Sequence, residues 1–330
     1  MPAPSNFERA ARPPASGIGG HGHDSAETEA AAQALAWGDL VILPTETVYG
    51  LAADAANAAA VARLFAAKRR PSFNPLITHV SDTGRARTIA TLGDAGERLA
   101  RAFWPGPLTI VGAVRDGQSV CDLARAGLDT VAVRVPANSV AQAVLAKFAG
   151  PIVMPSANRS GRPSPTTFAA AMEETGAFAA LGLDDGPCVR GLESTVVAVL
   201  DGPPRLLRPG PVTREAIEAL IGPLAAAGMD AARSPGRMAR HYAPDAPVRL
   251  EATAPRPGEA FLAFGDAEAG PAVFNLSPAG DLAEAAANLF AFLRAADALA
   301  PTAIAVASIP SDGLGEAIND RLQRAAGMVG

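Results

Sequence analysis

Residue types that mark several classes of protein are scarce in this sequence of 330 residues. Its two cysteines, Cys121 and Cys188, are too few for a disulfide framework or a four-cysteine zinc site. No apolar run reaches the roughly 18 to 20 residues that span a bilayer. The polar, Pro/Gly-rich first residues do not resemble a secretory signal. We therefore expect a cytoplasmic protein with reduced cysteines and no membrane attachment.

Familiar catalytic signatures are also missing. The chain contains no G-x-x-x-x-G-K-[ST] loop, no H-E-x-x-H and no C-x-x-C, and no Ser-His-Asp or Cys-His arrangement stands out. A G-x-G-x-x-G pattern at Gly17, Gly19 and Gly22 follows ARPPAS rather than a strand, so we do not interpret it as a dinucleotide site. With no obvious covalent nucleophile and no predicted metal ligands, the plausible catalytic groups are donors and cations. Such groups suit phosphoryl or nucleotidyl transfer.

Lysine is scarce as well, because the 28 basic residues include only Lys68 and Lys147 and the others are arginine. A lysine that persists against this bias marks a position where a compact ammonium fits and a guanidinium does not, or it persists by chance.

Charge is unevenly distributed along the chain. A net charge of -5 argues against a protein that coats nucleic acid by neutralising phosphates. Residues 61–101, however, carry eight basic and three acidic side chains. Such a cluster suits a small polyanion such as a nucleotide, or it consists of solvated helix faces.

The pattern of apolar residues predicts an α/β protein, and 49% hydrophobic residues are enough for a real core. We predict a disordered tail over 1–24, a mixed-sheet catalytic domain over 25–212, an interdomain linker over 213–246 that begins with a short helix, and a smaller Rossmann-like domain over 247–330. The strands predicted in the catalytic domain are 40–44, 76–80, 108–114, 130–135, 151–154, 194–200 and 205–208.

Polar residues follow the first of these strands in PTETVYGLAADA, residues 44–55. Ligands collect at strand ends in α/β sheets, so Thr45, Glu46 and Thr47 are candidate site residues. An ordinary polar turn would have the same composition.

KRRPSFNPLITH, residues 68–79, places Lys68 and Arg70 beside two prolines. Pro71 and Pro75 lower the entropy cost of fixing charged groups against an anion, which favours a positioned loop over a solvated helix end.

MPSANRSGRPSPTTF, residues 154–168, alternates hydroxyl and amide side chains with Gly and Pro immediately before a predicted helix. Hydroxyls next to a helix N-terminus can form a phosphate site, although a well-capped loop is the plainer alternative. Arg134, within the apolar strand TVAVRV, needs an anionic partner, and Arg208 precedes a rigid Pro-Gly-Pro.

Together these segments resemble the YrdC-like family of threonylcarbamoyl-AMP synthases. PTETVYGL, K-x-R-P-x-x-N-P-L-x-x-H, WPGPLT, RVP, PSAN-x-SG-x-PSPT, EST and R-x-G occur in the order typical of the family. SPGRMARHYAP resembles the interdomain linker of its long form, and GLGEAINDRLQRAA resembles the end of the extra C-terminal domain. The resemblance covers about residues 26–327.

The resemblance implies a twisted α/β sheet around a positively lined cavity. It also implies synthesis of threonylcarbamoyl-AMP and pyrophosphate from L-threonine, bicarbonate and ATP, with Mg²⁺, for the threonylcarbamoyladenosine modification of tRNA. The tRNA threonylcarbamoyl transferase machinery would be a transient partner. By matching motif positions, L-threonine would contact Thr47, His79, Arg134, the backbone at Met154, and Ser194. ATP would contact Arg70, Asn74, Thr130, Ser156, Ser164, Arg208 and Tyr242. Lys68 and Arg70 would be the catalytic residues, with Lys68 at the reacting centre.

The linker departs from the family pattern, because Arg237 replaces a methionine and Ala239 a tyrosine. Arg237, Arg240, His241 and Tyr242 still concentrate cationic and aromatic groups in a segment otherwise rich in Ala, Gly and Pro. We expect such a segment to act as a lid over bound nucleotide rather than as a tether.

Two rival hypotheses remain at this stage. The carbamoyl-adenylate chemistry of hydrogenase maturation uses a related domain but needs a zinc finger that two cysteines cannot build. An RNA-binding or ribosome-assembly module would use the basic 61–101 surface, and its binding would weaken steeply with salt. We expect no stable nucleic-acid binding.

Overall fold

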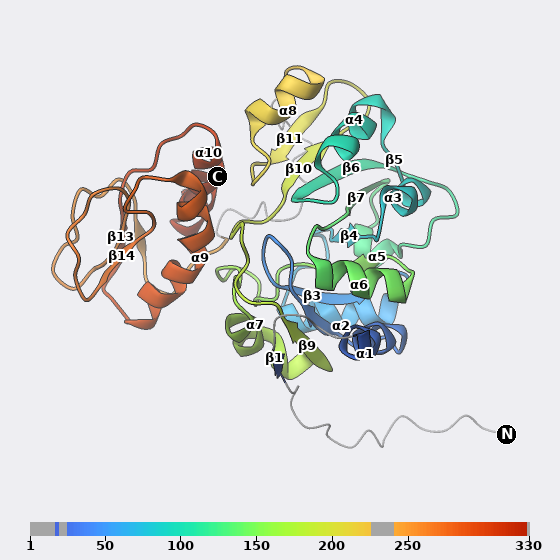
Figure 1. Cartoon of the computed structure of the whole chain (residues 1–330), viewed down its shortest axis with the longest axis horizontal. Coiled ribbons are helices and arrows are strands. Elements are labelled where there is room, and N and C mark those ends of the chain that lie inside the picture. Colours follow the sequence, from blue (N-terminus) through green and yellow to red (C-terminus); the bar gives the residue numbers. More distant parts are fainter. Residues whose placement is uncertain (1–16, 20–24, 226–240, 329–330) are drawn as a thin grey trace.

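A computed structural model describes residues 17–19, 25–225 and 241–328. Figure 1 shows a larger domain beside a smaller C-terminal one. The larger domain contains a mixed sheet in the order β1-β9-β2-β3-β8-β4-β7-β6-β10-β11, with β5 paired to β6. The predicted α/β fold with a large mixed sheet is therefore confirmed.

The strands of this sheet are β1 (Gly17–Gly19), β2 (Val41–Leu43), β3 (Gly50–Asp54), β4 (Ile77–His79), β5 (Ala90–Thr91), β6 (Leu108–Val114), β7 (Thr130–Arg134), β8 (Ile152–Val153), β9 (Leu181–Asp184), β10 (Thr195–Ala198) and β11 (Arg205–Arg208). The helices around it are α1 (Ser25–Ala36), α2 (Ala58–Lys68), α3 (Thr83–Ile89), α4 (Gly93–Phe103), α5 (Asp122–Arg125), α6 (Ser139–Phe148), α7 (Phe168–Thr175) and α8 (Arg214–Ile221).

Several helices of this domain begin at a capping side chain. Asn57 Oδ1 accepts hydrogen bonds from the backbone N–H groups of Ala59 and Ala60 at the start of α2. Asn138 and Thr167 cap α6 and α7 in the same manner. Because a cap satisfies N–H groups that have no partner inside the helix, these boundaries could be predicted from the sequence.

The strand register places the ends of several strands at one edge of the sheet. In the parallel pair of β4 and β7, His79 lies opposite Arg134. In the parallel pair of β10 and β6, Thr195 lies opposite Leu108. Since β6 runs antiparallel to β7, with Ile110 opposite Val133, the start of β10 reaches the same edge as the ends of β4 and β7. This edge carries the site described below.

The structure differs from the sequence-based prediction in a few elements. Strand β3 has the sequence GLAAD and lacks the β-branched residues that mark strands, so it was not predicted. The short elements α3, α5 and β9 were also missed. Within the predicted disordered tail, Gly17–Gly19 instead pair in parallel with β9, because an edge strand offers backbone groups that need no matching side chains. The rest of the tail lies outside the described residues.

The smaller domain has a four-stranded sheet in the order β12-β15-β13-β14, and every pair in it is parallel. Its elements are β12 (Val248–Arg249), β13 (Ala260–Ala263), β14 (Val273–Asn275), α9 (Leu282–Ala298), β15 (Ile304–Val306) and α10 (Leu314–Ala325). Both described helices lie on the face toward the larger domain (Figure 1). The parallel strands agree with the Rossmann-like prediction, but helices on both faces are not seen in the described residues.

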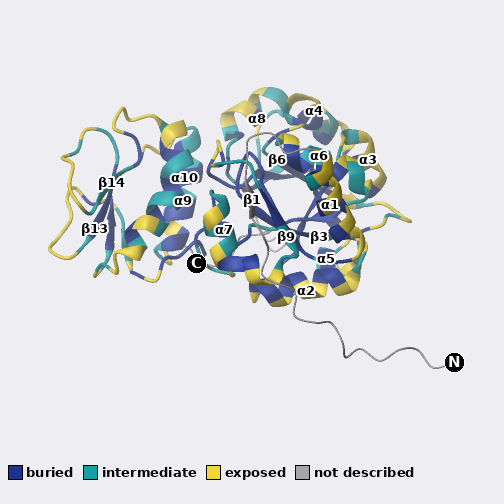
Figure 2. Ribbon diagram, turned by 60° about the horizontal axis from the view of Figure 1, so that its bottom comes forward, coloured by how far each residue is buried: buried dark blue, intermediate teal, exposed yellow. Residues whose placement is uncertain are grey.

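The two domains share a buried interface (Figure 2). Val48 and Leu192 of the larger domain belong to the same apolar cluster as Tyr242, Leu289 and Phe290. Across this cluster the smaller domain packs directly on the larger one.

The predicted linker 213–246 is divided in the structure. Helix α8 packs on α4, and its Ile217 belongs to the core of the larger domain. Residues 241–246 pack beneath the smaller domain, where Tyr242 and Ala246 join the shared cluster. Arg237, Ala239 and Arg240, and with them most of the predicted lid, lie outside the described residues. In the described part of the chain no helix is long and apolar enough to cross a bilayer.

Candidate active site

An open pocket of about 510 Å³, counted out to its mouth, lies at the edge where β4, β7 and β10 meet and faces the smaller domain. We divide its polar lining into two groups. The strand wall consists of Thr47, His79, Arg134, Met154 and Ser194, and the cationic wall consists of Arg70, Ser156, Glu193, Arg208, His241 and Tyr242. All the residues predicted to contact threonine are on the strand wall, and four of those predicted to contact ATP are on the cationic wall.

Arg134 is the centre of the strand wall. Its Nη2 donates to Glu46 Oε1 at 2.7 Å, its Nη1 to Thr47 Oγ1 at 3.0 Å and its Nε to the carbonyl of Gly106 at 3.2 Å. The Arg134 and Glu46 side chains are 4% and 9% exposed. Glu46 is therefore the anionic partner that an arginine inside an apolar strand requires.

The PTET turn is fixed by its own hydroxyl groups. Thr45 Oγ1 lies 2.7 Å from Thr47 Oγ1 and donates to the carbonyl of Val48 at 2.6 Å. It also accepts from the backbone N–H of Thr47 at 3.1 Å. The segment is therefore both a polar turn and part of the pocket, since Thr47 and Val48 line it.

His79 presents a neutral imidazole to the pocket. Burial and the neighbouring Arg134 lower the pKa of His79 well below its ordinary value. Its Nδ1 has no hydrogen-bond partner among the described residues. A neutral ring beside a fixed guanidinium can accept a proton or a hydrogen bond from a substrate amine.

Ser194 and Arg208 join the two walls. Arg208 donates to the carbonyl of Ser194 through Nε at 3.0 Å and Nη2 at 2.9 Å, and to Ser194 Oγ at 3.1 Å. The same Oγ lies 2.7 Å from Thr109 Oγ1. The antiparallel pairing of β10 with β11 places Arg208 opposite Val196 and so fixes this contact.

Arg70 enters the cationic wall from the end of α2. Arg69 takes a left-handed conformation with φ of 49° and ends the helix. Arg70 then donates to the carbonyls of Asn74 at 3.3 Å and Pro75 at 3.1 Å. Burial, together with the nearby Arg208, lowers the pKa of Arg70 to about 10, so the side chain remains charged at neutral pH.

Lys68 does not line the pocket in this structure. It is fully buried and donates to the carbonyls of Ser156 and Asn158, behind the cationic wall. Burial and the positive charge of Arg70 lower its pKa well below the ordinary lysine value. The structure thus places Lys68 as a support for the 156–158 backbone, whereas the resemblance placed it at the reacting centre.

Three other predicted ATP contacts are not among the described lining residues. Asn74 supports Arg70 through its carbonyl, and Ser164 donates its hydroxyl to Glu193. Thr130 begins β7, four residues before Arg134 and on the same face of the strand, about 13 Å away at roughly 3.3 Å per residue.

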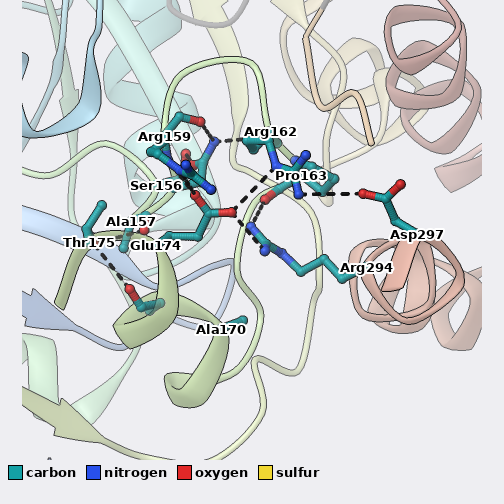
Figure 3. Close-up of polar contacts among 12 residues, drawn as sticks. Ser156, Ala157, Arg159, Arg162, Pro163, Ala170, Glu174, Thr175, Arg294 and Asp297 are labelled. Atoms are coloured by element: carbon teal, nitrogen blue, oxygen red, sulfur yellow. Dashed lines mark hydrogen bonds and ion pairs between the residues drawn. The ribbon is translucent and has the colours of Figure 1, made fainter. Parts of the chain in front are cut away.

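The loop that carries Ser156 is held by a buried carboxylate, Glu174 of α7 (Figure 3). Glu174 Oε2 accepts from Arg159 N at 3.0 Å and Arg159 Nε at 3.1 Å, and Oε1 accepts from Arg294 Nη1 at 3.0 Å. Arg294 belongs to α9 and also donates to the carbonyl of Pro163. Nearby, Arg162 bridges to Asp297 of the same helix. The smaller domain therefore contacts the far end of this loop.

The structure adds residues that sequence reasoning did not assign to the site. Glu193 belongs to the EST motif, but only its neighbour Ser194 was assigned a substrate contact. His241 was expected only as part of a lid. Burial, followed by the charges of Arg70, Lys68, Arg208 and Arg321, lowers the pKa of His241 well below its ordinary value. So many cations around one ring suit a polyanionic ligand.

No described group of three or more His, Cys, Asp or Glu side chains could hold a metal ion. The polar groups that line the pocket are thus arginines, hydroxyls, neutral imidazoles and one carboxylate, Glu193, in a two-domain α/β chain.

Comparisons with known proteins agree with this architecture. Residues 33–210 match the Sua5/YciO/YrdC family model, described as telomere recombination, and the chain belongs to this family. Residues 212–327 match a second model, described as the C-terminal domain of threonylcarbamoyl-AMP synthase. Together the two models identify the chain as a member of the two-domain type, which confirms the resemblance seen in the sequence.

Individual relatives cover nearly the whole chain. It is 38% identical to the threonylcarbamoyl-AMP synthase of Pyrococcus abyssi over 88% of this chain and 91% of that protein. It is 36% identical to that of Bacillus subtilis over 90% and 92%. The crystal structure of P. abyssi Sua5 complexed with L-threonine superposes with a TM-score of 0.86 at 36% identity, covering 92% of this chain and 95% of that one.

Proposed function

We propose that this chain is an L-threonylcarbamoyladenylate synthase, a nucleotidyltransferase that forms threonylcarbamoyl-AMP and pyrophosphate from L-threonine, bicarbonate and ATP. The product would serve the threonylcarbamoyladenosine modification of tRNA. The observation that carries the proposal is one pocket whose lining combines a strand wall suited to an amino acid with a cationic wall suited to a triphosphate. Similarity to a protein crystallised with L-threonine supports it.

The reaction has two bond-forming steps. The threonine amine attacks the carbon of bicarbonate and gives a carbamate with loss of water. A carbamate oxygen then attacks the α-phosphorus of ATP, and the bond to the β-phosphate oxygen breaks to release pyrophosphate. Mg²⁺ arrives with ATP as part of the substrate.

The strand wall would bind and orient threonine. Arg134 offers a guanidinium held in one orientation by Glu46, which suits a carboxylate. The neutral ring of His79 can take a hydrogen bond from the amine as it becomes a nucleophile.

The cationic wall would hold the polyphosphate. Arg70 and Arg208 are each fixed by backbone carbonyls, so little reorganisation is needed as negative charge moves to the leaving pyrophosphate. Holding carbamate and α-phosphorus in line can supply up to about 7 to 11 kcal/mol of the barrier reduction.

The rival RNA-binding hypothesis loses its main support, the basic 61–101 surface. Arg70 lines the pocket, and Lys68 is buried against the carbonyls of Ser156 and Asn158. Arg87 is paired with Glu97 at 2.7 Å, while Arg63 and Arg98 donate to the carbonyls of Gly38 and Leu220. Most of the cluster is therefore engaged in the pocket region or in local contacts, and the exposed arginines that remain are Arg69, Arg85 and Arg101.

The test is pyrophosphate release in the absence of tRNA, with threonine, bicarbonate or ATP omitted in turn. We expect release only with all three present, and labelled bicarbonate should enter an adenylate. Robust ATP turnover without threonine would contradict the proposal. Steeply salt-dependent RNA binding without turnover would favour the rival.

A further inference from the structure

Arg321 is the largest fully buried side chain of the described residues, with no exposed surface, and it belongs to the smaller domain. It lies on α10, within the GLGEAINDRLQRAA segment. A fully buried arginine is rare unless paired, so its partners indicate what it does.

Those partners belong to the cationic wall. Arg321 Nε donates to Glu193 Oε2 at 2.9 Å. The carbon at the centre of the guanidinium lies 5.3 Å from the centroid of the Tyr242 ring, within cation–π range. Glu193 and Tyr242 both line the pocket. Through these two residues, a side chain of the smaller domain shapes the wall of a pocket in the larger one.

The remaining contacts show how the guanidinium is balanced. Nη1 donates to Asp320 Oδ2 at 2.8 Å, and Nη2 has no partner among the described residues. On the opposite side, the second oxygen of Glu193 accepts from the hydroxyl of Ser164. Glu193 is thus fixed between α10 and the 154–168 segment, immediately before Ser194.

The sign of the Glu193 charge makes this pairing important. Every other ionisable residue of the cationic wall is a cation or a neutral group, and Glu193 alone would repel a triphosphate. A buried carboxylate without a partner is also costly in itself. The guanidinium of Arg321 offsets that charge from outside the pocket and therefore occupies no ligand space.

We propose that Arg321 is a positioning residue supplied by the smaller domain, which neutralises Glu193 and holds Tyr242 so that the cationic wall can accept ATP. This inference rests on the proposed function, because it takes ATP as the ligand of that wall. It also gives the smaller domain a defined part in nucleotide binding.

The variant Arg321→Gln tests the proposal, and Arg214→Gln is its matched control. Arg214 of α8 pairs with Glu316 of the same α10 helix at 2.5 Å, also between the domains, and neither residue of this pair lines the pocket. We expect Arg321→Gln to raise the KM for ATP at least tenfold and the KM for threonine less than threefold. Arg214→Gln should leave both within twofold of the wild type.

A charge-removing second change separates positioning from packing. In Arg321→Gln/Glu193→Gln the uncompensated carboxylate is gone, so at least a threefold recovery of the KM for ATP is expected relative to Arg321→Gln. A role in packing alone predicts that the double variant is no better than the single one, and that result would overturn the proposal.

Folding and nucleotide binding are followed separately from turnover. Circular dichroism and thermal unfolding report the fold, and calorimetry with a non-hydrolysable ATP analogue reports binding. If Arg321→Gln does not fold, Arg321→Lys replaces it; this variant keeps the charge but loses the planar fork, and we expect a threefold to tenfold weaker binding of the analogue. An unchanged affinity in a folded variant overturns the inference. A wild type that binds the analogue but forms no adenylate overturns the proposed function instead.

Discussion

The two walls of the pocket are built in different ways. The strand wall takes His79 and Arg134 from neighbouring strands of the sheet, where the parallel pairing of β4 and β7 sets them opposite each other. Met154 and Ser194 adjoin the ends of β8 and β10, and Thr47 lies in the turn between β2 and β3. The cationic wall takes Arg208 from β11, but Arg70 and Ser156 come from loops, and Tyr242 is held by the smaller domain. One wall is fixed by backbone register and the other by tertiary docking. Changes in backbone pairing should therefore damage the first, and changes at the domain interface the second.

The largest effect is expected at the centre of the strand wall. Arg134→Met removes one partner of a buried ion pair and leaves Glu46 unpaired. Breaking such a pair typically costs about 3 to 5 kcal/mol of unfolding free energy, which denaturant unfolding measures. Arg87→Met is the control, because its pair with Glu97 is largely exposed and should matter far less. Equal losses in the two variants would show that the strand wall is not specially dependent on this pair.

Lys68→Arg should follow, with a loss of roughly 10²-fold in kcat/KM, comparable to removing one stabilising donor from an active site. The wider guanidinium would displace the carbonyls of Ser156 and Asn158 and with them the cationic wall. Lys147→Arg should be nearly silent, since that side chain bonds Ser25 at the surface. The pyrophosphate assay measures both variants, and similar small effects at the two lysines would rule out a special requirement at position 68.

Low pH should destabilise the fold through one histidine in each wall, His79 and His241. The pKa values of His79 and His241 are depressed in the folded protein, so below the unfolded value of about 6.5 the unfolded chain binds protons that the folded chain does not. The free energy of unfolding therefore keeps its full value above that pH. Below it, the free energy of unfolding falls by up to about 1.4 kcal/mol per pH unit for each histidine. Denaturant unfolding between pH 5 and 7.5 measures the slope. In His79→Gln the slope of the unfolding free energy against pH should be smaller by the contribution of one proton. An unchanged slope would show that His79 does not contribute to the pH dependence.

The smallest effect is expected at the docking contact of the 156–163 loop. Arg294→Gln removes one of the donors to Glu174, while Arg159 remains (Figure 3). We expect the KM for ATP to rise about fivefold, because a lost hydrogen bond is typically worth about 1 kcal/mol, with little change for threonine. Arg249→Gln breaks an ion pair with Glu259 within the smaller domain and serves as the control. A larger rise in the KM for threonine than in the KM for ATP would contradict the assignment of the two walls to different substrates.

The same distinction explains what could be predicted from the sequence. All five residues of the strand wall were predicted, but as a set only through the family resemblance, because each stands in a short motif that the family shares. The contact between Glu193 and Arg321 joins positions 128 residues apart, and no local pattern reports such a pairing. Lys68 was noticed from composition, but the direction of its side chain depends on where the 156–158 loop folds. Strand β3 was missed because GLAAD carries no strand signal, although burial by its neighbours makes it a strand.

The position of Lys68 also bears on what counts as a conservative substitution. Only two of the 28 basic residues are lysine, so arginine is the usual cation of this chain. At position 68 the ammonium lies in a fully buried space between two backbone carbonyls, where a wider group would push the loop outward. At this position, therefore, exchanging one cation for the other keeps the charge but changes the shape of the group around which the loop is built.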